Sequence, residues 1–428
     1  MNILANMPTG AAAVFWGVLT FSLLVLLHEG GHFLAARAFG VRVHEYMLGL
    51  PGPALRWRSK RSGTAYGVTA VPLGGYVRIA GMEPGPEDPL LAHATGLLAD
   101  RGSIIARDLV EELGIDSDRA GALLATLEDY GAADVSKGGN DRSSLVHRES
   151  GETDEGLLTR VRSHVFRGLP TWKRLTVLAM GVIVNLVAAI LILAVTFAVW
   201  GTPTGVSRTV QVVQPATAAA RAGVAPGDTI IAIDGRRVAA WSQLLSTLKA
   251  RKPGDVVTLS VQRGGRLRTL AATLGSRSDG SAFLGVGPKA VYTPMSPLTA
   301  LETSLRWTGL VFVAVAQFFN PRTFVASITS ARSVVGASYE VATAAQDGPL
   351  PYAWLFALLS LSLGVINVVP IPPLDGGKMA LEIVERIARR PLSKRLALVL
   401  SGAGTILLLS LIFYLMYADI LRYVLNRG

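Results

Sequence analysis

The residues in this sequence most able to do chemistry are His28, Glu29 and His32, which form the pattern HEGGH at the end of an apolar stretch. Histidines four residues apart lie on one face of a helix, so both imidazoles can reach one zinc ion. The glutamate between them can take a proton from a water molecule that the metal activates. Residues 11–27, before the motif, carry no charge. Because ionisable groups at bilayer depth are costly and usually functional, the pattern predicts zinc-dependent peptide hydrolysis within a membrane.

The composition supports a membrane location for this motif. Hydrophobic residues make up 50% of the 428 residues and charged residues only 17%, which is less charge than a soluble protein of this length carries. A spanning helix needs about 20 mostly apolar residues. We therefore predict a multi-pass α-helical membrane protein with four transmembrane helices, at residues 11–36, 175–200, 352–370 and 396–417. The apolar run 307–319 is shorter and is predicted to be interfacial.

A third metal ligand is needed, because a catalytic zinc usually has three protein ligands. The chain has no cysteine, so the ligand must be a histidine or a carboxylate. Asp375 is the best candidate, within the segment NVVPIPPLDGG at 367–377. Its prolines stop a regular helix and its glycines permit an irregular backbone. Such backbone is tolerated at membrane depth only where it is buried in protein or lines a cavity.

The distribution of lysine and arginine predicts the orientation of the helices. Basic residues follow the first span, precede the second and fill the loop between the third and fourth. Such short basic flanks mark the cytoplasmic side. We expect residues 37–174 and 371–395 to be inside, and the N-terminus and residues 201–351 to be outside. This orientation depends on lysine and arginine alone, and it places His28 and Asp375 at cytoplasmic helix ends.

These motifs resemble the site-2 protease family of intramembrane zinc metalloproteases, in particular the bacterial enzymes that cleave anti-sigma factors. The resemblance rests on HEGGH at 28–32, PLGGYVRIAGM at 72–82, GVIVN at 181–185, NVVPIPPLDGG at 367–377 and a PDZ-like domain. The single PDZ copy resembles the actinobacterial type, since the well-known Gram-negative relatives carry two.

The resemblance implies roles for individual residues. His28, His32 and Asp375 would ligate Zn2+, and Glu29 would be the catalytic base. Asn367 matches an asparagine thought to contact the substrate backbone, although it could instead bridge helices through hydrogen bonds. Asn185, in the GVIVN segment, is expected to be a helix-packing residue.

Residues 65–79 are rich in β-branched and aromatic side chains and predict a short β-hairpin or bulged ribbon. The family uses this region as a loop that dips into the membrane beside the zinc. An open strand edge could pair with an unwound substrate, which would make Gly74, Gly75 and Tyr76 substrate-binding residues. The alternative is a small structural sheet on the cytoplasmic face.

Residues 204–290 resemble a PDZ domain of the type associated with bacterial proteases, with GVAPGDTIIAIDG at 223–235 as the clearest match. This segment contains 12 basic and 4 acidic residues, a balance that favours acidic partners or anionic headgroups. The resemblance leaves open whether the domain recruits substrates or excludes bulky ones.

The segment 83–165 is longer than the family pattern requires and is acidic, with 17 acidic and 7 basic residues between 83 and 160. Residues 103–113 and 117–130 have helix-turn-helix spacing, and 138–140 could form the tip of a wing. DNA binding needs a basic recognition surface, so we expect a protein-interaction or regulatory module. The alternative, strongest for 131–160, is a partly disordered linker.

The predicted organisation follows from these segments. Residues 1–82 are expected to hold a first span with HExxH and a membrane-associated β-hairpin, and residues 83–165 a cytoplasmic insert of winged-helix-like type. A second span at 166–203 and an external PDZ domain at 204–290 follow. Interfacial helices are expected at 291–351, and a third span with LDGG and a fourth span at 352–428. The predicted function is zinc-dependent site-2 cleavage in regulated intramembrane proteolysis. Alternatives are a metal-binding transporter, which would need ionisable residues in several helices, and a catalytically inactive PDZ-bearing scaffold.

The same motifs predict partners and location. Substrates would be single-pass membrane proteins such as anti-sigma factors, with spent signal peptides as a second class. A site-1 protease would cut the same substrate first, on the outer side. The protein would lie in the bilayer of the bacterial cytoplasmic membrane, with its zinc site near the cytoplasmic leaflet, and no nucleic acid partner is expected.

Overall fold

The computed structural model describes residues 9–82, 87–135, 142–277, 280–390 and 392–421. The chain forms two compact units, one made of residues 1–193 with 301–428 and the other of residues 194–300. The first unit contains the HEGGH and LDGG motifs, and the second contains the segment expected to be a PDZ domain.

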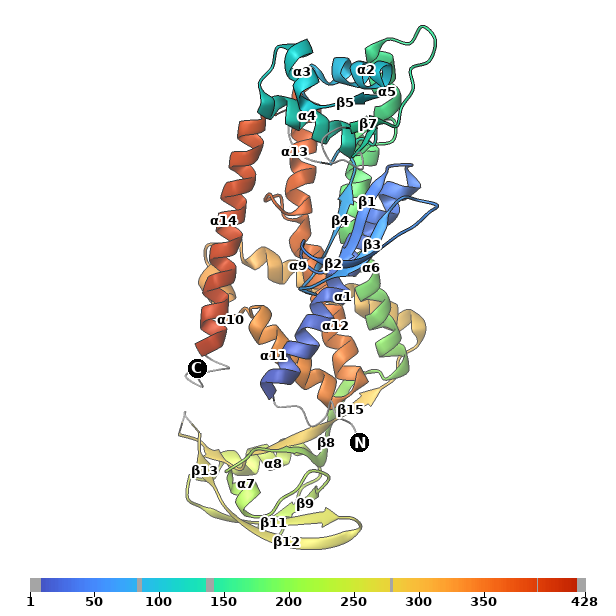
Figure 1. The fold of residues 1–428 in the computed structure, drawn as a ribbon. Helices are drawn as coiled ribbons and strands as arrows, with labels where there is room; N and C mark the ends of the chain where they lie inside the picture. Colours follow the sequence, from blue (N-terminus) through green and yellow to red (C-terminus); the bar gives the residue numbers. More distant parts are fainter. Residues whose placement is uncertain (1–8, 83–86, 136–141, 278–279, 391, 422–428) are drawn as a thin grey trace. The chain divides into compact units, whose positions relative to one another are not determined.

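Five helices in the described part of the chain are long and apolar enough to cross a membrane (Figure 1). They are α1 (Thr9–Ala38), α6 (Thr171–Val199), α9 (Pro297–Gln317), α12 (Pro349–Val368) and α14 (Lys394–Asp419). Four of them correspond to the four predicted spans. Their outward-facing leucine, valine and phenylalanine side chains remain exposed in the isolated chain, as expected where lipid rather than water surrounds a helix.

Helix α9 contains most of the apolar run that was predicted to be interfacial. The helix begins ten residues before that run, at Pro297, and so reaches a length and composition compatible with a span. Helix α9 is therefore a fifth candidate span, and the count of four transmembrane helices stays a prediction.

Small residues bring the helices of the first unit close together. Ala12 and Ala13 of α1 are buried against Ala342 of α11 (Val334–Asp347). A Cβ atom on Gly17 of α1 would overlap the side chain of Ser338 on α11. Short side chains at such contacts let helix backbones approach, which is how membrane helices associate in the absence of a strong hydrophobic driving force. The remaining helices of this region are α10 (Phe324–Ser330) and α13 (Asp375–Ala388).

The predicted hairpin within 65–79 is wrong. Strands β3 (Ala65–Thr69) and β4 (Gly75–Ile79) do not pair with each other but lie on either side of β1 (Val43–Leu48), parallel and antiparallel to it respectively. Strand β2 (Ala54–Arg58) pairs with β3, and the sheet order is β2-β3-β1-β4. The prediction failed because β1, with its mixed sequence VHEYML, was not recognised as the central strand.

Two kinds of contact hold this sheet beside α1 (Figure 1). The hydroxyl of Tyr46 on β1 donates to the carbonyl of Leu26 on α1 at 2.8 Å. Val43 and Ile79 of the sheet are buried in one cluster with Ala36 of α1. Strand β4 is an edge of the sheet and the strand that contacts α1 most closely.

The acidic insert is a folded module with its own core. Its elements are α2 (Leu91–Arg101), β5 (Ser103–Ile104), α3 (Ala106–Leu113), α4 (Ser117–Asp129), β6 (Ala133–Val135), β7 (Arg142–Ser144) and α5 (Asp154–Arg162). Leu98, Leu109, Leu123 and Leu127 are buried together. This element order, with the antiparallel sheet order β5-β7-β6, is the one expected for a winged helix. The predicted wing tip at 138–140 lies outside the described residues.

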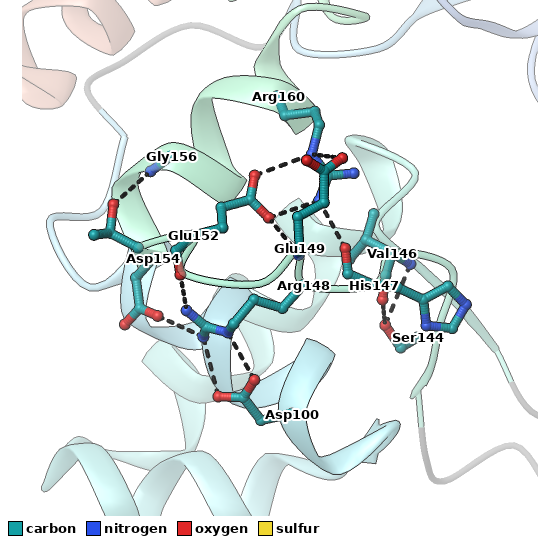
Figure 2. A network of polar contacts seen from close by, with 11 residues as sticks. Asp100, Ser144, Val146, His147, Arg148, Glu149, Glu152, Asp154, Gly156 and Arg160 are labelled. Carbon is teal, nitrogen blue, oxygen red and sulfur yellow. Dashed lines mark hydrogen bonds and ion pairs between the residues drawn. The ribbon is translucent and has the colours of Figure 1, made fainter.

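The expectation of a disordered linker is wrong for the described residues between 142 and 160. Arg148 donates to Asp100 on α2 and to Asp154 at the start of α5, and Arg160 donates to Glu152 (Figure 2). These ion pairs connect the segment after β7 to two helices. Composition suggested disorder because it counts charges without revealing that they are paired.

The second unit is a β-structure with two short helices, α7 (Ala218–Arg221) and α8 (Trp241–Lys249). Its strands are β8 (Thr202–Val213), β9 (Thr229–Ile233), β10 (Arg236–Arg237), β11 (Val256–Arg263), β12 (Arg266–Thr273), β13 (Gly275–Ser276), β14 (Ala282–Phe283) and β15 (Val286–Thr293). The main path of the large sheet is β12-β11-β9-β8-β15.

Apolar packing and one ion pair stabilise this unit. Trp241 and Leu244 of α8 are buried against the sheet residues Ile230 and Leu259. The buried carboxylate of Asp228 accepts from Arg263 at 2.6 Å. This guanidinium holds the pKa of Asp228 below its ordinary value, so the carboxylate stays charged and paired at neutral pH.

Candidate metal centre

Three side chains from two distant parts of the chain meet in the helical core of the first unit. His28 and His32 lie on one face of α1, and Asp375 is the first residue of α13. The Nε2 atoms of the histidines are 3.3 Å apart, and Oδ2 of Asp375 lies 2.8 Å from His28 and 3.1 Å from His32. All three residues are buried, and their donor atoms form the one such cluster found among the described residues.

The size and chemistry of this cluster fit zinc. A tetrahedral ion with ligand bonds of about 2.0 Å separates its ligand atoms by about 3.3 Å, close to the three observed separations. Two imidazoles and one carboxylate are a common donor set for catalytic zinc. The Nδ1 atom of His32 lies 2.7 Å from the carbonyl oxygen of Val177 on α6. A carbonyl can only accept, so Nδ1 carries a proton, and Nε2 is the atom of His32 that faces the cluster and would bind a metal.

Asn185 contacts the other histidine. Its side-chain amide lies 3.4 Å from Nδ1 of His28, and its Oδ1 atom is buried without a hydrogen-bond partner among the described residues. The two ends of an asparagine amide are interchangeable in most structures. With the amide turned over, Oδ1 would accept from Nδ1–H of His28, and the Nε2 lone pair of His28 would point into the cluster.

Glycines allow α6 to approach the two histidines. A Cβ atom on Gly181 of α6 would overlap Nε2 of His32 and lie 2.9 Å from Cε1 of His28. A Cβ atom on Gly31 of α1 would lie 2.8 Å from the Cα atom of Gly181. The two helices therefore cross where each has a glycine, and this close approach brings Val177 and Asn185 to the imidazoles.

Two further glycines place Asp375. A Cβ atom on Gly376 would overlap the carbonyl of Val368, and one on Gly377 would overlap the backbone of Pro372. The segment between α12 and α13 thus folds tightly back on the start of α13. Lys378, one turn into the helix, lies with its Nζ atom 3.4 Å from Oδ1 of Asp375, so both oxygens of this buried carboxylate face partners.

Glu29 is positioned by the neighbouring sheet. Its Oε2 atom accepts from the backbone N–H of Val77 on β4 at 3.1 Å. The carboxylate therefore lies between the histidine-bearing face of α1 and the free edge of the sheet. A group fixed in this way is oriented before any substrate arrives.

The predicted substrate-binding residues lie in two places. Gly74 and Gly75 are at the start of β4, and Gly74 has a φ of 81°, which favours glycine. Tyr76 follows them, but its hydroxyl donates to Glu45 of β1 at 2.8 Å. Asn367 is buried near the end of α12, and its Nδ2 atom donates to the carbonyl of Leu363 one turn earlier.

Sequence reasoning missed three groups that orient the site: the carbonyl of Val177, the amide of Asn185 and the N–H of Val77. The first and last are backbone groups, which no residue type reveals. Asn185 had a signal, because a buried asparagine in an apolar helix requires a partner. Its partner could not be found without the fold.

This fold and donor set define a membrane-embedded metallohydrolase, and comparison with known proteins gives its family. The model of peptidase family M50 matches residues 16–411. The chain belongs to this family, the site-2 proteases, and is a zinc metalloprotease.

Relatives of similar length support this assignment. The chain is 28% identical to metalloprotease MmpA of Caulobacter vibrioides over 433 residues, with 94% of each chain covered. It is 24% identical to zinc metalloprotease RasP of Geobacillus kaustophilus, covering 95% of this chain and 97% of that one. Among solved structures, the PDZ domain of an SdrC-like protein from Listeria monocytogenes covers 20% of this chain and 90% of its own, with 24% identity and a TM-score of 0.18.

The glycine contact between α1 and α6 predicts the effect of a single methyl group. Gly181→Ala should displace the two imidazoles and lower both zinc retention and cleavage, the latter by about 100-fold, as expected for a misplacement of about 1 Å. Gly402→Ala on α14 is the matched control, since a Cβ atom there meets nothing within 4 Å. Zinc content and cleavage rate are measured on both purified variants. Equal values for the two variants would show that the helix crossing tolerates a methyl group.

Proposed function

We propose that this zinc metalloprotease is an intramembrane endopeptidase that makes the second cut in single-pass membrane proteins such as anti-sigma factors. One observation supports this proposal above the others: His28, His32 and Asp375 converge among apolar helices that are long enough to span a membrane. A protease with its donor atoms at this depth would act on peptide bonds inside or at the edge of the bilayer.

In the proposed mechanism His28, His32 and Asp375 hold the zinc, and Glu29 moves the proton. Bound zinc polarises a carbonyl and lowers the pKa of water, which is the chemistry that peptide hydrolysis needs. Glu29, held by the N–H of Val77, accepts a proton from the attacking water and passes it to the leaving amine. Val177 and Asn185 keep the imidazoles in the orientation that presents Nε2.

The outer edge of β4, where Glu29 already accepts from the N–H of Val77, is proposed to bind the substrate in an extended form. Peptide bonds in a helix are hydrogen-bonded and shielded, so a substrate helix must unwind before its carbonyl can be attacked. Strand β4 pairs on one side with β1 only and lies next to α1. An added strand here would run past Gly74 and Gly75 toward Glu29. Asn367 is proposed as a further backbone contact, with its amide released from Leu363.

The structure also bears on the alternatives. A scaffold without activity has no need for Glu29 to be oriented beside three converging donors. DNA binding by the insert is disfavoured because its described arginines are engaged with carboxylates, including Arg119 with Asp88 and Arg148 with Asp100. The exposed residues of α4, the helix that a winged helix would insert into DNA, include one basic residue, Arg119, which is paired with Asp88. The others are Ser117, Asp118, Gly121, Ala122 and Ala125.

We also propose an orientation and a role for the second unit. Its strand order and short helices are consistent with a PDZ domain, and we place it outside the cytoplasmic membrane with the N-terminus. The insert and the metal centre would then lie toward the cytoplasm, and a site-1 protease would trim substrates on the outer side first.

One substitution distinguishes the role of Glu29 as a base from the role of the zinc ligands. Glu29→Gln should retain the fold and the zinc but lose cleavage by a factor of at least about 100, because an amide cannot accept the proton. The measurement is cleavage of a single-pass model substrate by the purified protein, with the cut site located by mass spectrometry. Glu302→Gln, on an exposed position of α9, is the control. Cleavage at the wild-type rate in Glu29→Gln would remove this residue from the mechanism.

The contact with His28 predicts that Asn185 affects metal binding. Asn185→Leu should weaken zinc affinity by about 10- to 100-fold, the usual effect of losing a group that orients a metal-bound histidine. Asn185→Asp keeps an acceptor oxygen and should restore most of the affinity. Zinc affinity is measured by competition with a chelator, independently of cleavage. Wild-type affinity in Asn185→Leu would return Asn185 to a packing role.

The proposed orientation can be tested with single cysteines, since the chain has none. A cysteine at Ser281 should react with an impermeant thiol reagent added to intact cells, whereas one at Ser143 should react only after permeabilisation. The opposite pattern, or labelling of both from one side, would contradict the proposed topology between the insert and the second unit.

A further inference from the structure

A large cavity in the first unit is not used by the proposed mechanism. It has a volume of about 690 Å³ and lies where the insert, the start of α6 and the end of α13 meet. Six arginines line it: Arg162, Arg167, Arg174, Arg386, Arg389 and Arg390. Three glutamates line it as well, so positive charge exceeds negative charge by three.

The glutamates neutralise one side of the cavity only. Glu87 accepts from Arg162, and Glu382 lies 2.9 Å from Arg174. Glu385 accepts from the backbone N–H of Leu392 at 2.9 Å. Arg386, Arg389 and Arg390 have no carboxylate partner within the described parts of the chain. The surplus of charge therefore lies at the C-terminal end of α13.

The paired arginines also retain unused hydrogen-bond donors. The Nε atoms of Arg162 and Arg174 are buried and have no acceptor among the described residues. A buried donor without a partner costs free energy, and most native structures avoid it. Because these Nε atoms are covered by protein, an anion in the cavity would reach the partly exposed remainder of each side chain instead.

An apolar chamber adjoins this cavity. Its volume is about 310 Å³, and Arg167, Arg174, Glu382 and Glu385 line both spaces. Phe166, Leu178 and Leu381 contribute apolar surface to it. A ligand that occupies both spaces must be anionic at one end and apolar at the other.

The position of the cavity and the apolar chamber indicates the class of ligand. Arg174 lies in the first turns of α6, and Ala397 lies in the first turns of α14. Both residues line the apolar chamber. Both helices are long and apolar enough to span a membrane. The ends of such helices lie at the level of lipid headgroups, where basic pockets between helices bind anionic headgroups.

We propose that the two spaces form a binding site for an anionic phospholipid. Its phosphate contacts the arginines at the end of α13, since arginine pairs with phosphate through parallel hydrogen bonds. One acyl chain enters the apolar chamber beside Leu178. An acidic peptide would match the charge but not the apolar chamber, and is therefore the less suitable ligand.

The first test removes the surplus charge. In the triple variant Arg386→Gln, Arg389→Gln, Arg390→Gln, the affinity for phosphatidylglycerol should fall on the order of 100-fold, given about 1 kcal/mol for each basic residue near an anionic lipid. Binding is measured on the purified full-length protein by native mass spectrometry, with phosphatidylcholine as the zwitterionic reference. Zinc content and thermal unfolding are measured alongside, and Arg386→Gln alone serves if the triple variant is unstable.

The matched control removes the same charge elsewhere. Arg236, Arg237 and Arg266 are exposed residues of the second unit, and their replacement by glutamine should leave phosphatidylglycerol affinity unchanged. An equal loss in this control, or equal binding of the two lipids by the wild-type protein, would overturn the proposal.

The second test separates a lipid from a soluble phosphate. Ser401→Phe places a ring in the apolar chamber, which Ser401 lines, and should lower phosphatidylglycerol affinity at least tenfold, on the order expected for excluding a few methylene groups. Binding of glycerol phosphate, which has no acyl chain, should be weak and unaffected. Tight binding of glycerol phosphate with no effect of Ser401→Phe on the lipid would identify a site for soluble anions and overturn the lipid assignment.

Discussion

The structure of the first unit depends on burying a carboxylate and two imidazoles among apolar helices. An isolated ionised group at this depth is expensive, whereas a group with partners is tolerated. Asp375 meets His28 and His32 through one oxygen and Lys378 through the other. The two Nε2 atoms and this oxygen face one point, where a bound metal ion would offset the cost of burying them. The three groups meet only when α1 and the start of α13 are together, and this requirement links the two ends of the chain.

The three groups can meet only if the backbones that carry and surround them approach one another closely. Helix α6 approaches α1 at Gly31 and Gly181, and the chain turns tightly into α13 at Gly376 and Gly377. The HEGGH, GVIVN and LDGG motifs thus contain both the polar groups and the glycines that allow those groups to meet. A motif glycine in this protein is as closely tied to the metal centre as a ligand is, because a methyl group at Gly181 would occupy the space of the imidazoles.

Much of the site could be predicted from sequence because its residue types are distinctive. A histidine pair at helical spacing and an aspartate in a broken helix are costly in apolar segments unless they bind a metal or one another, and the structure brings them together. The sheet was harder to predict. Strand β1 pairs in parallel with β3 and antiparallel with β4, and the contact of Glu45 with Tyr76 that supports this order joins residues 31 positions apart. Local alternation of side chains cannot reveal such pairing.

The number of charged residues in a segment also does not reveal which of those charges are paired. The insert is the most acidic part of the chain, yet its described arginines are engaged locally, as Arg148 is with Asp100 and Asp154 in Figure 2. Arginines at the end of α13 are few, but they face a cavity with too few carboxylates to neutralise them. Binding strength follows the unpaired charge rather than the count, because a paired guanidinium has already exchanged water for a carboxylate. An anion should therefore bind at α13, a short helix that carries Asp375 in its first turn and Arg386 in its last.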